Sequence, residues 1–188
     1  TEVLINVGDI NEAPSLSSAL SSTSFSEDSA LGTIIATSSV ADPESNTITY
    51  SLTGTGSEYF SVDENGNVTL KDSLDFETYT NYEITLVASD GELTSTSVIT
   101  FDISDVDEAP SLSSTLKSDS FEETIAVGTA LASISSIDPE SQTITYSLSG
   151  TGSENFEIDS EGNITSKVAF DYETETSYTF NVTASDGT

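Results

Sequence analysis

The sequence predicts an all-β fold of tandem seven-stranded Greek-key β-sandwiches joined end to end. The chain repeats itself, because Asp9–Pro14 (DINEAP) returns as Asp105–Pro110 (DVDEAP), and 105 − 9 = 96 residues. Apolar and polar residues alternate over several stretches, which is the period of a strand with one buried face. Seven short strands in about a hundred residues are typical of a β-sandwich. No stretch has helical periodicity of useful length.

Seven strands are expected in a complete repeat. In the sixth, Tyr82, Ile84 and Leu86 alternate with polar residues and should face the core. Asn65-Gly66 favours a tight hairpin turn between the fourth and fifth strands, because this pair accepts positive φ angles. The expected strands of the first repeat lie near residues 19–27, 31–39, 46–53, 59–62, 67–70, 80–89 and 94–104.

The phase of the repeat sets the expected domain boundaries. Residues 1–8 align with residues 97–104, so they are expected to be the last strand of a preceding repeat. Residues 9–104 then form a complete repeat, and residues 105–188 form a second repeat that lacks its final strand. We expect the chain to be a window on a longer array. Alternatively, residues 1–8 of one molecule could complete the second repeat of another molecule, head to tail.

The composition excludes several classes of function. The chain has 33 acidic and 3 basic residues and a net charge of −30, so nucleic acid and anionic lipid surfaces are not expected partners. It has no Cys and no His, which excludes disulfides, thiolate chemistry and imidazole bases. No apolar run is long enough for direct membrane insertion. Carboxylate oxygen remains in quantity, and this ligand suits hard cations such as calcium.

Many of the acidic residues lie in short clusters at predicted turns and at the joint between repeats. Converging carboxylates are unfavourable unless a cation neutralises them or protons are taken up. Calcium takes six to eight oxygens at about 2.3–2.6 Å, so the clusters predict calcium binding. The clusters, with their counterparts 96 residues later, are Glu27 (Glu123), Asp42 and Glu44 (Asp138 and Glu140), Asp75 and Glu77 (Asp171 and Glu173), Asp90 (Asp186), and the linker group Asp9, Asn11 and Glu12 (Asp105, Asp107 and Glu108).

These motifs resemble the cadherin repeat, especially the cadherin-like repeats of large bacterial surface adhesins. Asp105–Pro110 (DVDEAP) is similar to the family's linker DxNDNxP, although it is one residue shorter. Leu74–Glu77 (LDFE) is similar to LDRE, with Phe76 in place of the arginine. Asp138–Glu140 (DPE) and Ala184–Gly187 (ASDG) resemble DxD and AxDxG. The resemblance implies a cadherin/Ig-like sandwich, an extracellular or cell-surface location and about three Ca²⁺ ions at each complete junction between repeats.

The resemblance also implies which residues bind calcium. Two further groups would form half-sites that bind calcium more weakly or not at all. The complete junction would use Glu27, Asp75 and Glu77, then Asp105, Asp107 and Glu108 from the linker, and Asp138, Glu140 and Asp186 from the second repeat. The upstream half-site would use Asp9, Asn11, Glu12, Asp42, Glu44 and Asp90. The downstream half-site would use Glu123, Asp171 and Glu173, with Glu122 as an alternative to Glu123.

The expected function is therefore structural. The chain would be a calcium-rigidified extender, or stalk, of a cell-surface adhesin that supports cell adhesion, with neighbouring repeats of the same chain as its partners. The alternative is a binding module that recognises polysaccharide or pairs homophilically with the same repeats on another cell. Tyr59 and Tyr79, which repeat two replaces with Asn155 and Glu175, are its candidate contacts. No enzymatic activity is expected, because the acids recur in both repeats whereas an active site is normally unique. A solubilising or salt-adapted surface competes as an explanation of the acids.

Overall fold

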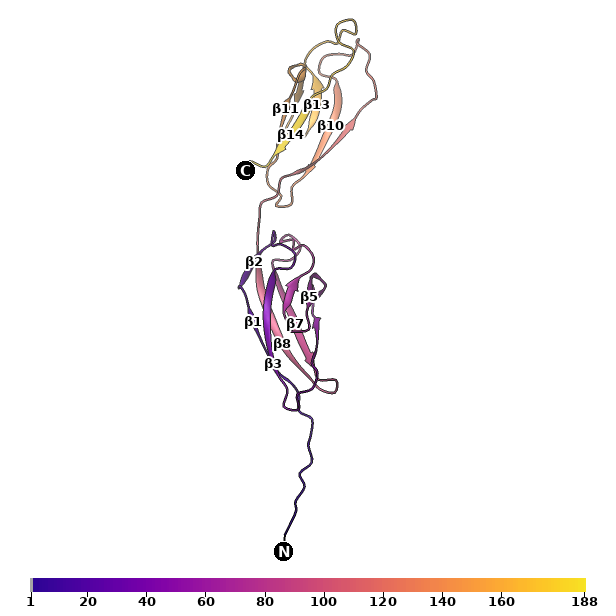
Figure 1. Ribbon diagram of the computed structural model, residues 1–188. Helices are drawn as coiled ribbons and strands as arrows, with labels where there is room; N and C mark the ends of the chain where they lie inside the picture. Colours follow the sequence, from indigo (N-terminus) through magenta and orange to yellow (C-terminus); the bar gives the residue numbers. More distant parts are fainter. Residues whose placement is uncertain (1) are drawn as a thin grey trace. The chain divides into compact units, whose positions relative to one another are not determined.

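The computed structural model describes residues 2–188. These residues form two compact units, of which the first ends at Val106 and the second begins at Asp107 (Figure 1). Both units are built from β-strands, with one short 3-10 turn in each, η1 (Ser57–Tyr59) and η2 (Ser153–Asn155). The predicted all-β fold is confirmed. No helix in the described part of the chain has the length and apolar character needed to cross a membrane.

The first unit is a sandwich of two four-stranded sheets. One sheet has the order β1-β3-β6-β5, and the other has the order β2-β8-β7-β4. Neighbours in each sheet are mostly not consecutive in sequence, which is the Greek-key arrangement that the sequence predicts. The strands are β1 (Ser15–Leu20), β2 (Ser24–Ser26), β3 (Ile34–Ala41), β4 (Thr49–Thr53), β5 (Phe60–Val62), β6 (Val68–Leu70), β7 (Asn81–Ser89) and β8 (Thr94–Ser104).

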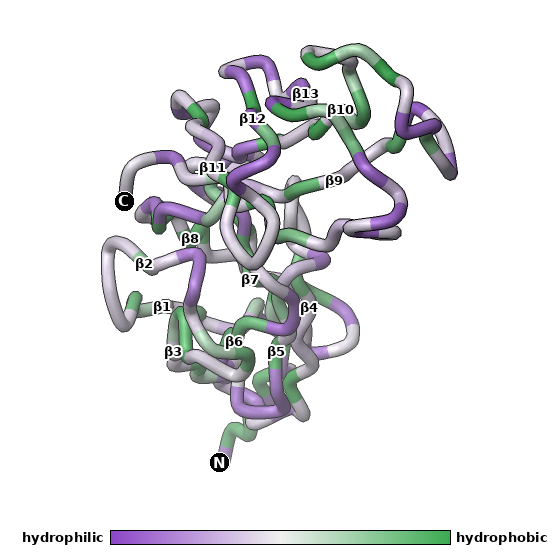
Figure 2. Tube along the Cα trace, turned by 90° about the horizontal axis from the view of Figure 1, so that it is seen from above, coloured by the Kyte–Doolittle hydropathy of each residue, from purple (hydrophilic) through white to green (hydrophobic). Residues whose placement is uncertain are grey.

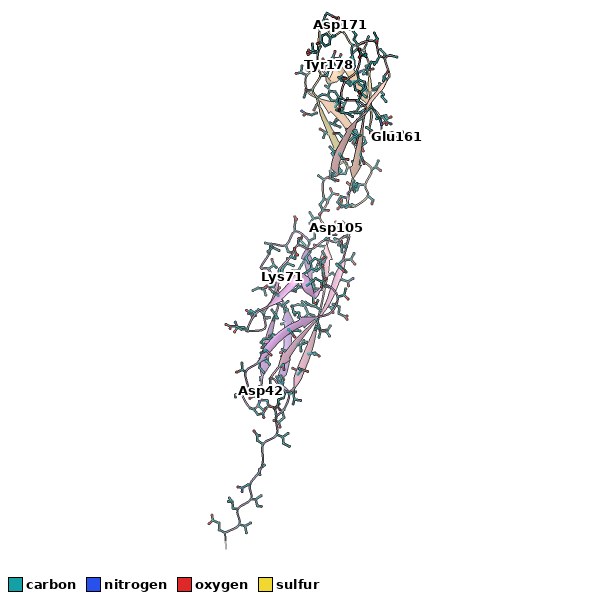
Figure 3. All side chains as sticks on the ribbon, turned by 90° about the vertical axis from the view of Figure 1, so that its right-hand side faces the viewer. Asp42, Lys71, Asp105, Glu161, Asp171 and Tyr178 are labelled. Atoms are coloured by element: carbon teal, nitrogen blue, oxygen red, sulfur yellow. The ribbon has the colours of Figure 1, made fainter. Side chains whose placement is uncertain are left out.

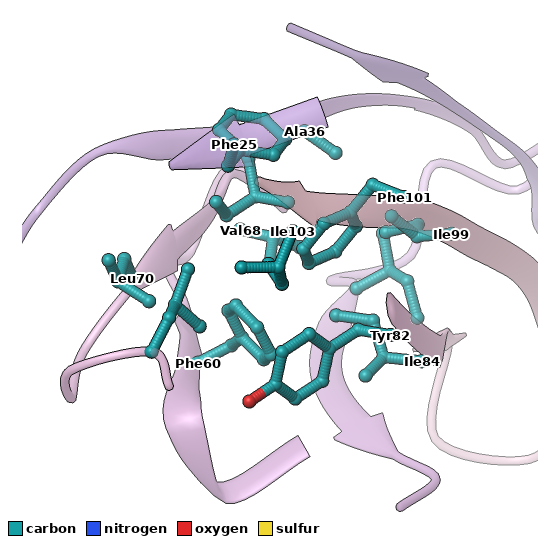
Figure 4. Packing of buried hydrophobic residues seen from close by; sticks show 13 residues of the cluster. Phe25, Ala36, Phe60, Val68, Leu70, Tyr82, Ile84, Ile99, Phe101 and Ile103 are labelled. Carbon is teal, nitrogen blue, oxygen red and sulfur yellow. The ribbon is translucent and has the colours of Figure 1, made fainter. Parts of the chain in front are cut away.

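The core of the first unit lies between its sheets. Alternate residues of β7 point inward, and Tyr82, Ile84 and Leu86 are buried as predicted. The ring of Phe101 on β8 is central, with centroids 5.2 Å from Phe25 and 5.6 Å from Tyr82 (Figure 4). Figure 2 shows hydrophobic residues on strands such as β3 and β10. This core holds the two ends of the sandwich in fixed positions.

The prediction of a single strand near residues 19–27 is wrong. The structure has two strands there, with β1 antiparallel to β3 in one sheet and β2 parallel to β8 in the other. The chain changes sheets at the polar residues 21–23. The hydroxyl of Ser21 donates to the backbone oxygen of Ile35 at 3.1 Å, so a side-chain hydrogen bond follows where the backbone pairing of β1 with β3 ends.

Residues 107–188 repeat this architecture as far as the counterpart of β7. Its four-stranded sheet has the order β12-β13-β10-β9, and its second sheet contains only β11 and β14. The strands are β9 (Ser111–Leu116), β10 (Ala130–Ile137), β11 (Thr145–Ser149), β12 (Phe156–Ile158), β13 (Asn163–Ser166) and β14 (Asn181–Ser185).

Two segments of the second unit have less strand structure than their counterparts in the first unit. In the first unit β2 pairs only with β8, and residues 120–122, which correspond to β2, form no strand. Residues 81–84 of β7 also pair only with β8, because β4 pairs with residues 85–89. The corresponding residues 177–180 form no strand either, so β14 is shorter than β7.

Residues 2–14 precede the first sandwich and form no strand in the structure (Figure 1). Val3, Ile5 and Val7 are strongly exposed. Thr1 lies outside the described residues. The assignment of residues 1–8 to a preceding repeat, and of residues 9–104 and 105–188 to two successive repeats, stays a prediction.

Candidate metal-binding sites

Glu27 organises one end of the first unit. It directly follows β2, and its side chain is 7% exposed. Its carboxylate accepts hydrogen bonds from the backbone N–H of Phe76 at 2.8 Å and of Val106 at 2.6 Å. The charge of this buried group is therefore stabilised by two backbone dipoles that come from distant parts of the chain.

Asp75 and Glu77 flank Phe76 in the turn before β7. The carboxylate of Asp75 accepts the N–H of Thr78 at 2.8 Å, which holds this turn. Glu27, Asp75 and Glu77 each present a carboxylate oxygen within 4.8 Å of the others. An oxygen of Asp105, which follows β8, also lies within 4.8 Å of one from Glu77. Four predicted ligands thus lie together at this end.

The second unit repeats this arrangement 96 residues later. Tyr172, the counterpart of Phe76, donates its backbone N–H to Glu123 at 2.9 Å. Glu123, Asp171 and Glu173 again each offer an oxygen within 4.8 Å of the others. Glu123, and not Glu122, belongs to this group of neighbouring oxygens, and its role as a ligand stays a prediction. Figure 3 labels Asp171 at this end of the unit.

Predicted ligands also meet at the other end of the first unit, where Figure 3 labels Asp42. The side-chain amide of Asn11 donates to Asp90 at 3.0 Å, and its carbonyl oxygen accepts from Asn46 at 3.0 Å. The N–H of Glu12 donates to Glu44 at 3.3 Å. These contacts surround an open hollow of about 450 Å³, lined by Asp9, Asn11, Glu44, Asn46, Asp90 and Glu92.

Neighbouring carboxylates and N–H groups shift the pKa values of acids at this end of the first unit. A hydrogen bond between the side chains of Glu12 and Glu44, together with their repulsion, raises the pKa of Glu12, and the same hydrogen bond lowers the pKa of Glu44. Backbone N–H groups of Leu93 and Glu92 lower the pKa of Asp90. One oxygen of Asp42 accepts the N–H of Asn46 at 2.9 Å, while its other oxygen accepts no hydrogen bond from the described residues.

The matching end of the second unit gathers Asp107, Asp138 and Asp186. Gln142 connects two of them, since its side chain donates to Asp107 and its N–H donates to Asp138 at 2.8 Å. Thr188 connects Asp107 with Asp186, and the N–H and hydroxyl of Thr188 lower the pKa of Asp186.

The remaining predicted ligands of this end are Glu108 and Glu140, both half-buried. No residue that the structure describes donates a hydrogen bond to either carboxylate oxygen of Glu140. This carboxylate therefore keeps its acceptor capacity for another group.

Sequence reasoning missed the amides in these groups. Asn46 and Gln142 both contact predicted ligands, and 142 − 46 = 96, so the recurrence of an amide at the repeat interval was a usable signal. The backbone donors of Phe76 and Val106 left no such signal. Their N–H groups donate to Glu27 across 49 and 79 residues of sequence, and only the tertiary structure brings them together.

The grouped oxygens fit a hard divalent cation. Two oxygens bound to one calcium ion at about 2.3–2.6 Å lie at most about 5 Å apart, and the groups at Glu27 and Glu123 meet this limit. With 33 acidic and only 3 basic residues, the chain cannot neutralise most of its carboxylates internally. Thiol and imidazole ligands are absent from the sequence, which favours calcium over softer metals.

The two tyrosines considered for ligand binding are engaged with the core. The rings of Tyr59 and Tyr79 are partly buried and lie 5.9 Å and 5.3 Å from that of Tyr82. They also contact each other at 6.1 Å. Their faces are therefore partly covered by neighbouring aromatic rings.

Comparison with known families accounts for the repetition of these groups. The sequence profile of the Cadherin domain matches residues 21–111 and again residues 117–188. The chain belongs to the cadherin family. Cadherin domains are extracellular repeats of adhesion proteins, so the family fits both the sandwich fold and the repeat.

Cadherins of known sequence and structure are similar over nearly the whole chain. Protocadherin Fat 1 from Homo sapiens is 32% identical over 97% of this chain, and Cadherin-related family member 1 from Gallus gallus is 34% identical over 94%. The solved structure of Protocadherin Gamma B2 extracellular cadherin domains 1-5 is 25% identical, with a TM-score of 0.57. It covers 96% of this chain, which covers 37% of it.

The two curated cadherins are much longer than this chain. The chain covers 4% of Protocadherin Fat 1 and 22% of Cadherin-related family member 1. The similarity therefore describes cadherin domains, and the role of a whole protein is a separate question.

Proposed function

We propose that these cadherin domains are calcium-rigidified extender repeats of a large bacterial surface adhesin. The observation that supports calcium binding is that one group of carboxylates occurs twice, as Glu27, Asp75 and Glu77 and again as Glu123, Asp171 and Glu173. Each group gathers carboxylate oxygens within the range of one ion. The resemblance to repeats of bacterial adhesins supports this parent protein, whereas the relatives compared above come from human and chicken.

The ligands of a complete junction would be those that the sequence predicts. Glu27, Asp75 and Glu77 belong to the first repeat, Asp105, Asp107 and Glu108 to the linker, and Asp138, Glu140 and Asp186 to the second repeat. About three ions would bind, and the groups at the outer ends of the two units would act as half-sites. Calcium would offset the mutual repulsion of these acids and restrict movement at the linker, so that the repeats extend as a rod.

Calcium binding is tested by thermal unfolding during a calcium titration. A ligand that binds only the native state stabilises it by about 2.7 kcal/mol at a hundred times its dissociation constant. Extracellular calcium modules bind at about 10⁻⁴–10⁻³ M, so the melting temperature should rise over millimolar calcium. Magnesium is the control, because it prefers a smaller octahedral site and should be less effective. A melting temperature that millimolar calcium does not change contradicts the proposal.

Rigidification is tested separately by small-angle X-ray scattering with calcium and with chelator. Calcium should increase the maximum dimension and narrow the distribution of conformations. The double variant Asp105→Asn/Asp138→Asn should resemble the chelated protein. The control Glu64→Gln/Glu161→Gln removes the same number of charges from exposed hairpin positions and should retain the calcium response. Scattering that is identical with and without calcium would contradict the rod while leaving calcium binding intact.

The alternative is a module that binds polysaccharide or pairs homophilically with cadherin-like repeats on another cell. Its candidate contacts, Tyr59 and Tyr79, pack on Tyr82, and this reduces the ring area they can offer. Binding on glycan arrays, or calcium-dependent clustering of beads coated with this chain, would favour the alternative. Negative results in both assays would favour a passive extender.

A further inference from the structure

The hairpin between β5 and β6 contains the only Asn-Gly pair in the sequence, Asn65-Gly66. Asn65 is exposed at the tip of this hairpin. Every other asparagine of the chain is followed by a residue that carries a side chain, whereas glycine leaves its backbone nitrogen unhindered. The nitrogen of Gly66 and the side-chain amide of Asn65 are therefore two neighbouring groups that can react within one chain.

The folded turn restrains both groups. The N–H of Gly66 donates to the backbone oxygen of Asp63 at 3.0 Å, and the N–H of Asn65 donates to the carboxylate of Asp63 at 2.9 Å. Asn67 holds the same carboxylate with its backbone N–H and its side-chain amide, each at 2.8 Å. The Gly66 nitrogen must give up its proton and approach the Asn65 side chain to react, so its hydrogen bond to Asp63 must break first.

The position of the hairpin in the sheet allows its tip to open locally. β5 is an edge strand in the order β1-β3-β6-β5, and it pairs with β6 over three residues only. Phe60, Val68 and Leu70 of these strands are buried, whereas the tip residues Asp63 and Asn65 are exposed. Exposed elements with few buried contacts open at a lower free energy than the whole domain. The tip can therefore open while the sandwich stays folded.

We propose that Asn65 is a site of spontaneous deamidation, reached when the hairpin tip opens. The Gly66 nitrogen attacks the side-chain carbonyl carbon of Asn65 and closes a cyclic succinimide. The side-chain nitrogen of Asn65 leaves as ammonia with the proton from Gly66. Water then opens the ring. Opening at the side-chain carbonyl gives aspartate, whereas opening at the main-chain carbonyl gives isoaspartate, whose main chain is longer by one carbon.

The second repeat shows that the turn accepts an acid at this position. Glu161 corresponds to Asn65, and its N–H donates to the carboxylate of Asp159 at 3.0 Å. The N–H of Gly162 donates to the backbone oxygen of Asp159 at 3.1 Å, and the φ angles of Gly66 and Gly162 are +78° and +81°. The two turns thus have the same hydrogen bonds and the same glycine conformation. An aspartate at position 65 should therefore keep the hairpin intact.

Isoaspartate does not fit the same turn. Its additional main-chain carbon displaces Gly66, which lies close to its neighbours. A Cβ atom on Gly66 would lie 2.0 Å from the hydroxyl of Ser38 and 2.8 Å from the ring of Tyr50, so this side of the turn has no space for a longer chain. The isoaspartyl form should therefore have a less stable hairpin at this edge of the sheet.

The first test is prolonged incubation of the folded chain at neutral pH, followed by tandem mass spectrometry that locates each conversion of an amide to an acid. Asn65 should convert faster than every other asparagine of the chain. The chain unfolded in urea, incubated in parallel, should convert at Asn65 faster still, because its Gly66 nitrogen is not held by Asp63. An Asn65 that stays intact in the folded chain while the unfolded chain converts overturns the proposal.

The second test is Asn67→Ala, which loosens the turn and leaves the Asn-Gly pair unchanged. Loss of one hydrogen bond to a charged group should raise the open fraction, and with it the rate at Asn65, about tenfold. Asn163→Ala is the matched control, because it removes the same 2.8 Å bond, to Asp159, from the other hairpin and should not change that rate. Equal rates at Asn65 in the wild-type chain and in Asn67→Ala overturn the proposal that opening of the turn controls the reaction.

The third test compares the two products, which ion-exchange chromatography separates from the starting chain because deamidation adds a negative charge. Asn65→Asp provides the aspartyl form directly and should unfold in urea at the wild-type midpoint. The isoaspartyl form isolated from the aged chain should unfold at a lower midpoint. An isoaspartyl form as stable as Asn65→Asp would contradict the close packing that the structure shows around Gly66.

Discussion

The carboxylate of Glu27 accepts a hydrogen bond from the backbone N–H of Phe76 at 2.8 Å, across 49 residues of sequence. Glu123 and Tyr172 repeat this relationship in the second unit at 2.9 Å. In both units the glutamate fixes the turn whose flanking acids complete a group of three carboxylates. A single side chain thus has a structural role, through the backbone, and a proposed calcium-binding role, through its charge.

Glu27→Gln is expected to weaken both roles. The amide nitrogen of glutamine cannot accept a hydrogen bond, so one of the N–H groups of Phe76 and Val106 loses its partner. A buried unsatisfied donor costs about 1–3 kcal/mol, which urea unfolding in chelator should detect. The calcium-induced rise in melting temperature should also shrink. The control is Asp28→Asn, an exposed neighbour outside the carboxylate group, and equal behaviour of the two variants would refute the assignment.

The hairpin turn at Asp63 gives a pH-dependent prediction. Asn67 donates its side-chain amide and its backbone N–H to Asp63, each at 2.8 Å, and these bonds lower the pKa of Asp63 below its ordinary value of 3.8. The carboxylate is thus favoured by the folded state. Its contribution to stability is present above pH 3.8 and is lost as the pH falls through the lowered pKa.

Carbon-detected NMR titration of Asp63 measures this directly. The midpoint should lie below that of an aspartate in the denatured chain, and Asn67→Ala should move it upward. Asp159 provides an internal replicate, because Asn163 lowers its pKa through the same two bonds at 2.8 Å. An Asp63 midpoint that does not respond to Asn67→Ala would show that another group causes the shift.

The sequence predicted regular strands well and their ends less well. Alternation alone placed β7 and identified Tyr82, Ile84 and Leu86 as core residues, because one face of that strand is buried along its length. The change of sheet at residues 21–23 was missed, since a run of Ser and Thr suits a strand and a turn equally. Residues 120–122 form no strand although they align with β2, because strand formation there depends on a partner that residues 107–188 do not supply.

The sequence predicted which carboxylates belong to each group, but not which contacts they make. Recurrence at 96 residues selected Glu27, Asp75 and Glu77, which the structure brings together. It also pairs Glu27 with Glu123, while Glu122 stayed an alternative because its carboxylate is adjacent in sequence. It also could not show that backbone N–H groups donate to these carboxylates.

Gly66 gives a prediction about hairpin geometry. It has φ +78°, and a Cβ atom there would lie 2.0 Å from the hydroxyl of Ser38 and 2.8 Å from the ring of Tyr50. Gly66→Ala combines backbone strain of about 1 kcal/mol with this clash. Gly91→Ala is the matched control, because Gly91 has φ +105° with no atom within 4 Å of its Cβ position. Chemical denaturation should show a larger loss for Gly66→Ala, and equal losses would mean that the neighbours move aside without cost.

Tyr82 tests how the core tolerates a buried polar atom. The residue is 2% exposed, and its hydroxyl has no hydrogen-bond partner among the described residues. Burial, with smaller contributions from Tyr59 and Tyr79, raises its pKa to about 12. The neutral form is therefore required by the fold, so this contribution to stability is complete below pH 10 and is lost as the pH rises toward 12.

Tyr82→Phe separates the hydroxyl from the ring. The variant keeps the ring contacts with Phe60 and Phe101 at 5.1 and 5.6 Å and removes an unsatisfied buried group, so its stability should be unchanged or higher. Tyr82→Ala loses the ring and should cost about 3–5 kcal/mol. Ultraviolet titration should show that Tyr82→Phe abolishes a phenol that ionises well above pH 10. A marked loss of stability in Tyr82→Phe would instead mean that the hydroxyl is satisfied in solution, as by a bound water, because only then does its removal cost a hydrogen bond.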